Sequence, residues 1–195
     1  MSILIILLLV HSVPGLSGSD NTCPDDFEED ALVKSAMSGD LQLTRCLISK
    51  NANINALRKR NADTPLGVAA DRGYLEIVET LINAGALLDG QNRNGYSPLM
   101  NAASEGHHKI VMALVLAGAH LELKDSGGYT ALLHAVYHGY VKIVRSLVDQ
   151  GANVDTQNRN GETALMKGNH MHQILCVVFP PFKSFSLLTF FTLFL

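Results

Sequence analysis

Between residues 64 and 165, hydrophobic and polar positions recur in one register with a period of 33 residues. Each unit opens with a hydroxyl residue, then proline or alanine, then leucine, at 64–66, 97–99, 130–132 and 163–165. Two glycine positions keep the same spacing, and they are occupied by Gly73, Gly106 and Gly139 and by Gly85, Gly118 and Gly151. Such markers in one register indicate a tandem repeat in which every unit has the same structure.

Each unit predicts two helices followed by a loop. The hydroxyl residue that opens the unit suits a helix N-cap, because its oxygen can accept a free backbone N–H, and Pro65 and Pro98 follow at the first helical position. The first helix is expected to run to the first glycine, which suits a left-handed stop. The second helix has an apolar stripe with helical spacing, as at 75, 77, 78, 81 and 82. A polar loop such as 91–95 then leads into the next unit.

Residues 64–89 read TPLGVAADRGYLEIVETLINAGALLD, and residues 130–155 read TALLHAVYHGYVKIVRSLVDQGANVD. This pattern resembles the ankyrin repeat, whose units carry T-P-L-H-x-A-A, a glycine, V-x-x-L-L and G-A-D-V-N. The resemblance covers roughly residues 28–168 and implies an all-α ankyrin-repeat solenoid of helix-turn-helix units with turn and loop fingers. We expect the array at 31–168, with repeats at about 28–58, 59–91, 92–124 and 125–157 and a truncated repeat at 158–168.

The units depart from the family pattern at several positions. Gly67, Met100, Leu133 and Met166 stand where the family has a histidine after T-P-L. In the family that histidine ties adjacent turns together, so its replacement implies looser turns and lower stability. The loop after the first, diverged unit, 56–63, is one residue longer than the other loops, and the last unit loses the pattern after Met166. Because about three repeats are the minimum for a stable stack, the array barely exceeds that minimum.

The N-terminal end differs from the repeats. Residues 3–10 read ILIILLLV and are followed by a Pro-Gly break and small residues, so residues 1–18 are interpreted as a signal peptide. No Lys or Arg precedes this apolar run, and an uncleaved membrane anchor and an artefactual start stay open as alternatives. A signal peptide favours the secretory pathway, with a cytoplasmic location as the alternative. Residues 19–30 are interpreted as an acidic linker, since they hold six carboxylates.

The C-terminal end, residues 169–195, is an apolar tail outside the repeat pattern that finishes FPPFKSFSLLTFFTLFL. Its final apolar run is too short for an ordinary membrane-spanning helix, which needs about 20 apolar residues. We interpret the tail as a truncated or alternatively spliced end that replaces the remainder of a repeat. Contact with a membrane through the two apolar ends is the alternative interpretation.

Composition argues against several classes of function. The net charge of -3 argues against a nucleic-acid partner, which would favour a basic face. Cys23, Cys46 and Cys176 are odd in number and widely spaced, so they indicate neither a disulfide framework nor a zinc site. The sequence contains neither a phosphate-binding glycine loop nor a nucleophile elbow, so we expect neither an enzyme activity nor a cofactor.

The histidines are the remaining candidates for a metal site. His134 and His138 lie four residues apart and therefore share one face of a helix. A tetrahedral zinc site needs three or four ligands, and no cysteine or carboxylate completes this set convincingly. We interpret the histidines as surface residues, with one packed between helices, and expect no bound metal.

The resemblance implies a non-enzymatic scaffold or adaptor that binds another protein on the concave face made by the loops and the first helices. We expect the protein to be a monomer. The positions that vary within the family supply the candidate contacts. In the loops these are Arg60, Asn61, Asp63, Arg93, Asn94, Tyr96, Ser126, Tyr129, Arg159, Asn160 and Glu162, and on the first helices they are Asp71, Arg72, Ser104, Glu105, Tyr137 and His138. Tyrosine and arginine often dominate interface energy. The alternatives are a membrane-associated or secreted structural protein, or a truncated isoform or fragment of a longer ankyrin-repeat protein.

Overall fold

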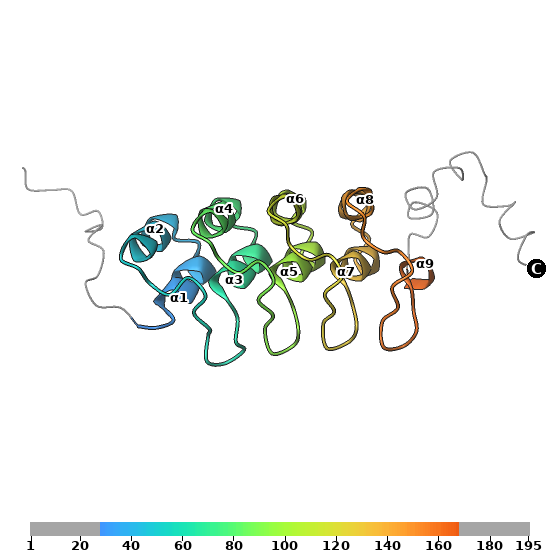
Figure 1. Cartoon of the computed structure of the whole chain (residues 1–195), viewed down its shortest axis with the longest axis horizontal. Coiled ribbons are helices and arrows are strands. Elements are labelled where there is room, and N and C mark those ends of the chain that lie inside the picture. Colours follow the sequence, from blue (N-terminus) through green and yellow to red (C-terminus); the bar gives the residue numbers. More distant parts are fainter. Residues whose placement is uncertain (1–27, 168–195) are drawn as a thin grey trace, which may run out of the picture.

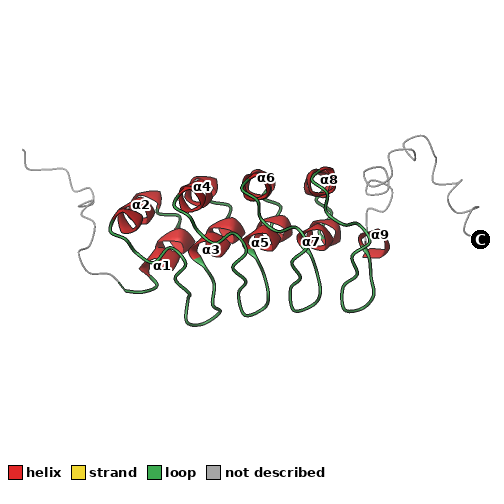
Figure 2. Cartoon of the chain, viewed as in Figure 1, coloured by secondary structure: helices red, strands yellow, loops and turns green. Residues whose placement is uncertain are grey.

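The computed structural model describes residues 28–167, which form a row of stacked helix pairs (Figure 1). The helices are α1 Ala31–Ser38, α2 Leu41–Ser49, α3 Pro65–Arg72, α4 Leu75–Asn83, α5 Pro98–Ser104, α6 His108–Leu116, α7 Ala131–Tyr137, α8 Val141–Asp149 and α9 Ala164–Lys167. Between residues 28 and 167 there are helices and loops and no strand, as Figure 2 shows in red and green. The prediction of an all-α array of helix-turn-helix units is confirmed.

The first helix of each complete unit begins at the predicted N-cap. The hydroxyl oxygen of Thr64 accepts the N–H of Gly67 at 3.0 Å, and that of Ser97 accepts the N–H of Met100 at 3.3 Å. Thr130 caps α7 in the same way. All of these hydroxyl residues are buried, so the cap also satisfies a backbone donor that water does not reach. The repeated sequence marker is therefore the physical start of each unit.

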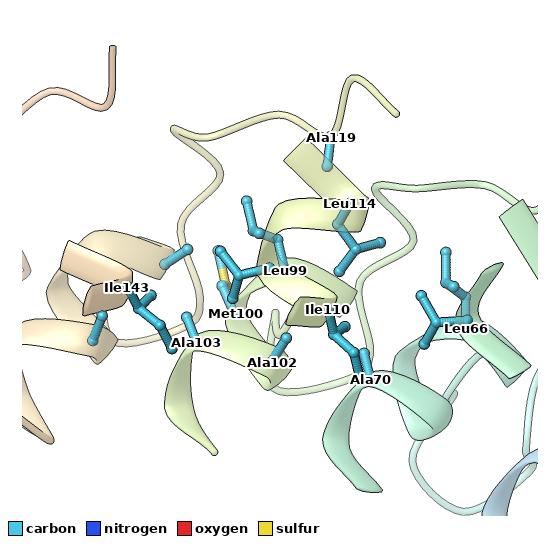
Figure 3. Close-up of a cluster of buried hydrophobic side chains, with 14 of the residues drawn as sticks. Leu66, Ala70, Leu99, Met100, Ala102, Ala103, Ile110, Leu114, Ala119 and Ile143 are labelled. Carbon is cyan, nitrogen blue, oxygen red and sulfur yellow. The ribbon is translucent and has the colours of Figure 1, made fainter. Parts of the chain in front are cut away.

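The hydrophobic core runs the length of the array between two rows of helices. The first helices form one row and the second helices the other (Figure 1). Equivalent positions in successive units are at most 2% exposed, and these are Leu66, Leu99 and Leu132, Ile77, Ile110 and Ile143, and Leu81, Leu114 and Leu147. Figure 3 shows part of this layer, with buried side chains of neighbouring units such as Leu66, Leu99 and Ile143. Burial of each such side chain stabilises the stack by about 1.5–3 kcal/mol, and much of that burial depends on a neighbouring unit.

Rings from one unit cover the glycines that end the first helices of the preceding unit. Gly73 and Gly106 have left-handed φ values of 81° and 80°, as predicted for helix stops. A Cβ at Gly73 would lie 2.7 Å from the ring of His107, and one at Gly106 would lie 2.8 Å from the ring of Tyr140. The same arrangement places Tyr74 over Gly39. These glycines therefore end the first helices and also leave the space that an aromatic or imidazole ring of the next unit fills.

The loops are joined to one another by backbone hydrogen bonds. The N–H of Arg93 donates to the carbonyl of Asn61 at 2.8 Å, and the N–H of Ser126 donates to the carbonyl of Asn94 at 2.9 Å. A third bond of this kind joins the loops at 127 and 159. The family histidine is absent at these turns, and the backbone itself ties neighbouring turns together. The lower stability that the missing histidine implies stays a prediction.

The first loop closes with alanine where the later loops have glycine. Ala62 has a left-handed φ of 56°, and its counterparts Gly95, Gly128 and Gly161 have φ values of 80°, 80° and 75°. An L-residue with a side chain pays about 1–2 kcal/mol for this conformation. The extra residue of the 56–63 loop thus accompanies a strained backbone position.

Replacing Ala62 with glycine should raise the free energy of unfolding by about 0.5–1 kcal/mol. The strain at φ 56° is removed, and the greater freedom of glycine in the unfolded chain offsets part of that gain. Urea denaturation of the two proteins measures the difference. A loss of stability would show that the methyl group of Ala62 contributes more through contacts than its backbone costs.

Some sequence-based predictions concern residues outside the described range. The signal peptide at 1–18, most of the acidic linker at 19–30 and the tail at 169–195 lie there and stay predictions. Within residues 28–167, no helix is both long and apolar enough to cross a membrane. Cys46 on α2 is disulfide-bonded, which the number and spacing of the cysteines did not indicate.

Candidate protein-binding face

The candidate contact residues lie on one side of the array. The loops extend from the row of first helices, on the side opposite the second helices (Figure 1). We call this side the loop-and-first-helix face, formed by the loops at 56–63, 91–96, 124–129 and 157–162 and by α3, α5 and α7. Ten of the candidate residues line hollows on this face, six in one hollow and four in another.

The first hollow, the aromatic pocket, has a volume of about 410 Å³. It is lined by Asn94, Tyr96, Asp125, Ser126, Gly127, Tyr129, His134, Tyr137 and His138. Two neighbouring loops, α7 and the residue that follows α7 supply these residues. The volume falls in the range of about 300–1,000 Å³ that is typical of small-molecule sites, so the pocket is large enough for a partner's side chain.

The buried side chains of His134 and Asp125 form the floor of the aromatic pocket. The Nε2 atom of His134 lies 3.0 Å from Oδ2 of Asp125, and the two side chains are 8% and 6% exposed. The rings of Tyr96 and Tyr129 pack on the imidazole with centroid distances of 4.9 and 5.4 Å. His134 is thus the histidine that packs inside the fold. Asp125 was missed by the sequence analysis, although asparagine stands at the matching loop positions 92 and 158.

Burial decides the charge state of this pair. Removal from water lowers the pKa of His134, and the hydrogen bond to Asp125 opposes that shift without outweighing it. His134 is therefore neutral at pH 7, although it contacts a carboxylate. Burial, with the charge of Asp125 as the next cause, raises the pKa of Tyr96. The floor of the pocket thus consists of a carboxylate group beside a neutral imidazole.

The lowered pKa of His134 predicts a loss of stability in mild acid. The unfolded chain takes up a proton on this histidine near its ordinary pKa of about 6.5, whereas the folded chain resists protonation. The contribution of the neutral His134 side chain to the free energy of unfolding is therefore complete above about pH 6.5. It is lost as the pH falls from there through the pKa of the folded state. We expect His134→Asn, which places the side chain of the equivalent residue Asn101 here, to flatten this dependence between pH 7 and pH 5. Parallel pH profiles of the unfolding free energy would contradict this assignment.

The second hollow, the polar pocket, has a volume of about 240 Å³. It is lined by Met37, Arg58, Asn61, Asp63, Val68, Asp71, Arg72, Asn92 and Asn101. Asn92 donates to Asp63 at 3.1 Å, and Arg72 lies 3.6 Å from Asp71. Burial, and next the charge of Glu105, raises the pKa of Asp71. This hollow contains charges of both signs, in contrast to the aromatic pocket.

The other candidates do not line either hollow. Exposed positions on the loops and at the end of α5 hold Arg60, Arg93, Glu105, Arg159 and Asn160. Arg93 donates through Nη2 to the carbonyl of Lys59 at 3.0 Å, which holds it against the preceding loop. Ser104 lies 3.4 Å from Nε2 of His138, and Glu162 accepts from Asn158 at 2.8 Å.

The described residues offer no assembled metal centre. Within residues 28–167, no group of three His, Cys, Asp or Glu side chains comes together in a way that could hold an ion. His134 and His138 share α7 and its end as expected, but they have different surroundings. His134 faces Asp125, whereas the ring of His138 stacks on Tyr140 with a centroid distance of 5.9 Å.

Comparison with known proteins agrees with the repeat pattern. The chain matches the family described as ankyrin repeats (3 copies) over residues 4–92 and 85–158. It is also similar to the ankyrin repeat and KH domain-containing protein mask-1 of Caenorhabditis elegans, with 36% identity over 80 residues. That match covers 41% of this chain and 3% of the relative, so the chain spans a small part of that protein's length. The sequence-based assignment is confirmed, and the chain belongs to the ankyrin-repeat family.

Proposed function

We propose that this array binds a partner protein on its loop-and-first-helix face. Ankyrin repeats typically form non-enzymatic modules that bind other proteins. The observation that supports this face is the convergence of ten candidate residues, from three loops and two helices, on two hollows. Positions far apart in the sequence thus form one surface that a folded partner could contact at once.

The chemistry of the aromatic pocket suits a protein interface. Tyr137 is 51% exposed at its edge, so a partner could remove a large aromatic area from water there. Tyr96 and Tyr129 are half-buried and held against the imidazole of His134, so they lose little freedom on binding. The backbone bonds between loops hold the same surface in place before a partner arrives. Such a preformed aromatic cluster is typical of an interface hot spot.

Partner capture with the full chain tests this proposal. Proteins retained by the wild-type chain are identified, and their affinities are measured for a variant with Tyr129→Ala and Tyr137→Ala. We expect the partner's affinity to fall about 30-fold or more, since the loss of a hot spot costs about 2 kcal/mol or more. Tyr137→Ala alone changes the exposed ring and leaves the half-buried Tyr129 in place, which separates binding from folding.

The matched control lies on the second helices. Glu79 on α4 and Lys142 on α8 are exposed, so Glu79→Ala and Lys142→Ala should leave the affinity unchanged. An affinity lowered by the second-helix variants and unaffected by the tyrosine variants would overturn the assignment of the face.

A further inference from the structure

The same loop position performs the same structural task in three successive loops. The Oδ1 atom of Asn92 accepts the N–H groups of Asn94 and Tyr96, both at 3.0 Å. The Oδ1 atom of Asp125 accepts from Gly127 and Tyr129, both at 2.8 Å. Asn158 accepts from the N–H groups of residues 160 and 162 at 2.9 and 3.0 Å. At 92 and 158 an uncharged amide oxygen accepts these backbone N–H groups. The hydrogen bonds of the loop therefore do not require a carboxylate at Asp125.

That charge lies under an aromatic surface and without a cationic neighbour in the pocket. His134, which contacts the carboxylate, is neutral at pH 7 because burial lowers its pKa. Among the residues that the structure describes, 28–167, no lysine or arginine lines the aromatic pocket. In a partly desolvated site a carboxylate acts over a longer range than in water. The pocket therefore combines a carboxylate at its floor with three tyrosine rings in its lining.

Negative potential and aromatic faces together favour a cation. We propose that the aromatic pocket binds the guanidinium group of an arginine side chain presented by the partner protein. This inference rests on the proposed protein-binding function and names the chemistry of one contact within it. The Asp125 side chain is only 6% exposed, so it attracts the guanidinium chiefly through its field, while the tyrosine rings make the contact.

Arginine suits this pocket better than lysine does. A guanidinium is planar, stacks on aromatic rings and presents five N–H donors, whereas an ammonium is compact and strongly hydrated. The side chains of Asn94 and Ser126 are exposed at the edge of the pocket and supply oxygen acceptors. Both the stacking surface and the acceptors are therefore in place for a flat, multiply donating group.

NMR titration of the full chain tests the inference without knowledge of the partner. The probes are arginine blocked as Nα-acetyl-arginine N-methylamide, the corresponding lysine compound, and the corresponding citrulline compound, which has nearly the shape of arginine and no charge. We expect the arginine probe to shift the amide signals of Ser126, Gly127 and Tyr129 saturably, with a Kd of about 1–10 mM for so small a ligand. The citrulline probe should bind about tenfold more weakly, and the lysine probe should also bind more weakly than arginine.

Asp125→Asn separates the charge from the shape of the pocket. The substitution reproduces the residue found at 92 and 158, so the loop should keep its hydrogen bonds and the amide spectrum elsewhere should stay unchanged. We expect the substitution to lower the affinity for the arginine probe about tenfold. Asp63→Asn, a matched change in the polar pocket, should have no effect on this probe.

Three results would overturn the inference. They are an absence of saturable arginine binding, equal binding of the arginine and citrulline probes, and an undiminished affinity of the arginine probe for Asp125→Asn. Failure here is distinguishable from failure of the proposed function. If the captured partner loses affinity in the tyrosine variants and keeps it in Asp125→Asn, the face is the binding face and the arginine assignment is wrong.

Discussion

Replacing Leu114 with alanine should lower the free energy of unfolding by about 3–4 kcal/mol. This side chain is 0% exposed on α6 and belongs to the core that runs through all units. Its removal leaves a cavity in the middle of the stack, where each unit depends on both neighbours for burial. The loss is large beside a whole stability of about 5–15 kcal/mol for a typical domain. Urea denaturation followed by circular dichroism measures it.

Leu116 provides the control on the same helix. It lies two positions further along α6 and is 75% exposed, so Leu116→Ala should change the unfolding free energy by less than about 0.5 kcal/mol. The two variants remove the same atoms from the same helix. Equal losses of stability would mean that burial between the two helix rows does not hold the array together.

Gly106→Ala should destabilise the protein by about 2–3 kcal/mol. An alanine at φ 80° costs about 1–2 kcal/mol in backbone strain. Its Cβ would also lie 2.8 Å from the ring of Tyr140, so the ring has to leave its place on the preceding unit. The loss of stability therefore combines backbone strain at residue 106 with a loss of packing between units. Denaturation by urea gives the sum of the two.

Gly85→Ala isolates the backbone term. Gly85 has a φ of 86°, and nothing lies within 4 Å of a Cβ at that position. We expect it to cost about 1–2 kcal/mol, which is less than the cost at Gly106. In a Tyr140→Ala background, Gly106→Ala should cost no more than Gly85→Ala does. An unchanged cost in that background would rule out the ring as the cause.

The period of the sequence was sufficient to place the helices. Thr64 and Ser97 lie 33 residues apart, and each precedes a proline. A hydroxyl residue directly before proline is typical of a helix N-cap. Helix starts could be predicted because their cause lies within a few residues. The apolar stripe of the second helix follows from 3.6-residue periodicity, which is equally local. The family resemblance also predicts that the loops and first helices form one face of the array.

Features that depend on contacts between units could not be predicted in this way. Tyr140 covers Gly106 across a unit boundary, and neither residue signals the other in the sequence. The pairing of Asp125 with His134 joins a loop to a helix, and this histidine stands one position after the place of the family histidine. The left-handed conformation of Ala62 follows from loop closure, which an alanine by itself does not indicate. In each case the deciding contact is made only once the chain has folded.

Hydrogen exchange of the full chain, with and without a captured partner, tests the binding face most directly. Backbone amides that a partner covers exchange more slowly, so the measurement maps the interface without any substitution. The proposed function predicts slower exchange in the loops at 91–96 and 124–129 and at the C-terminal end of α7, with α4, α6 and α8 unchanged. Slower exchange confined to the second helices, with the loops unaffected, would contradict it.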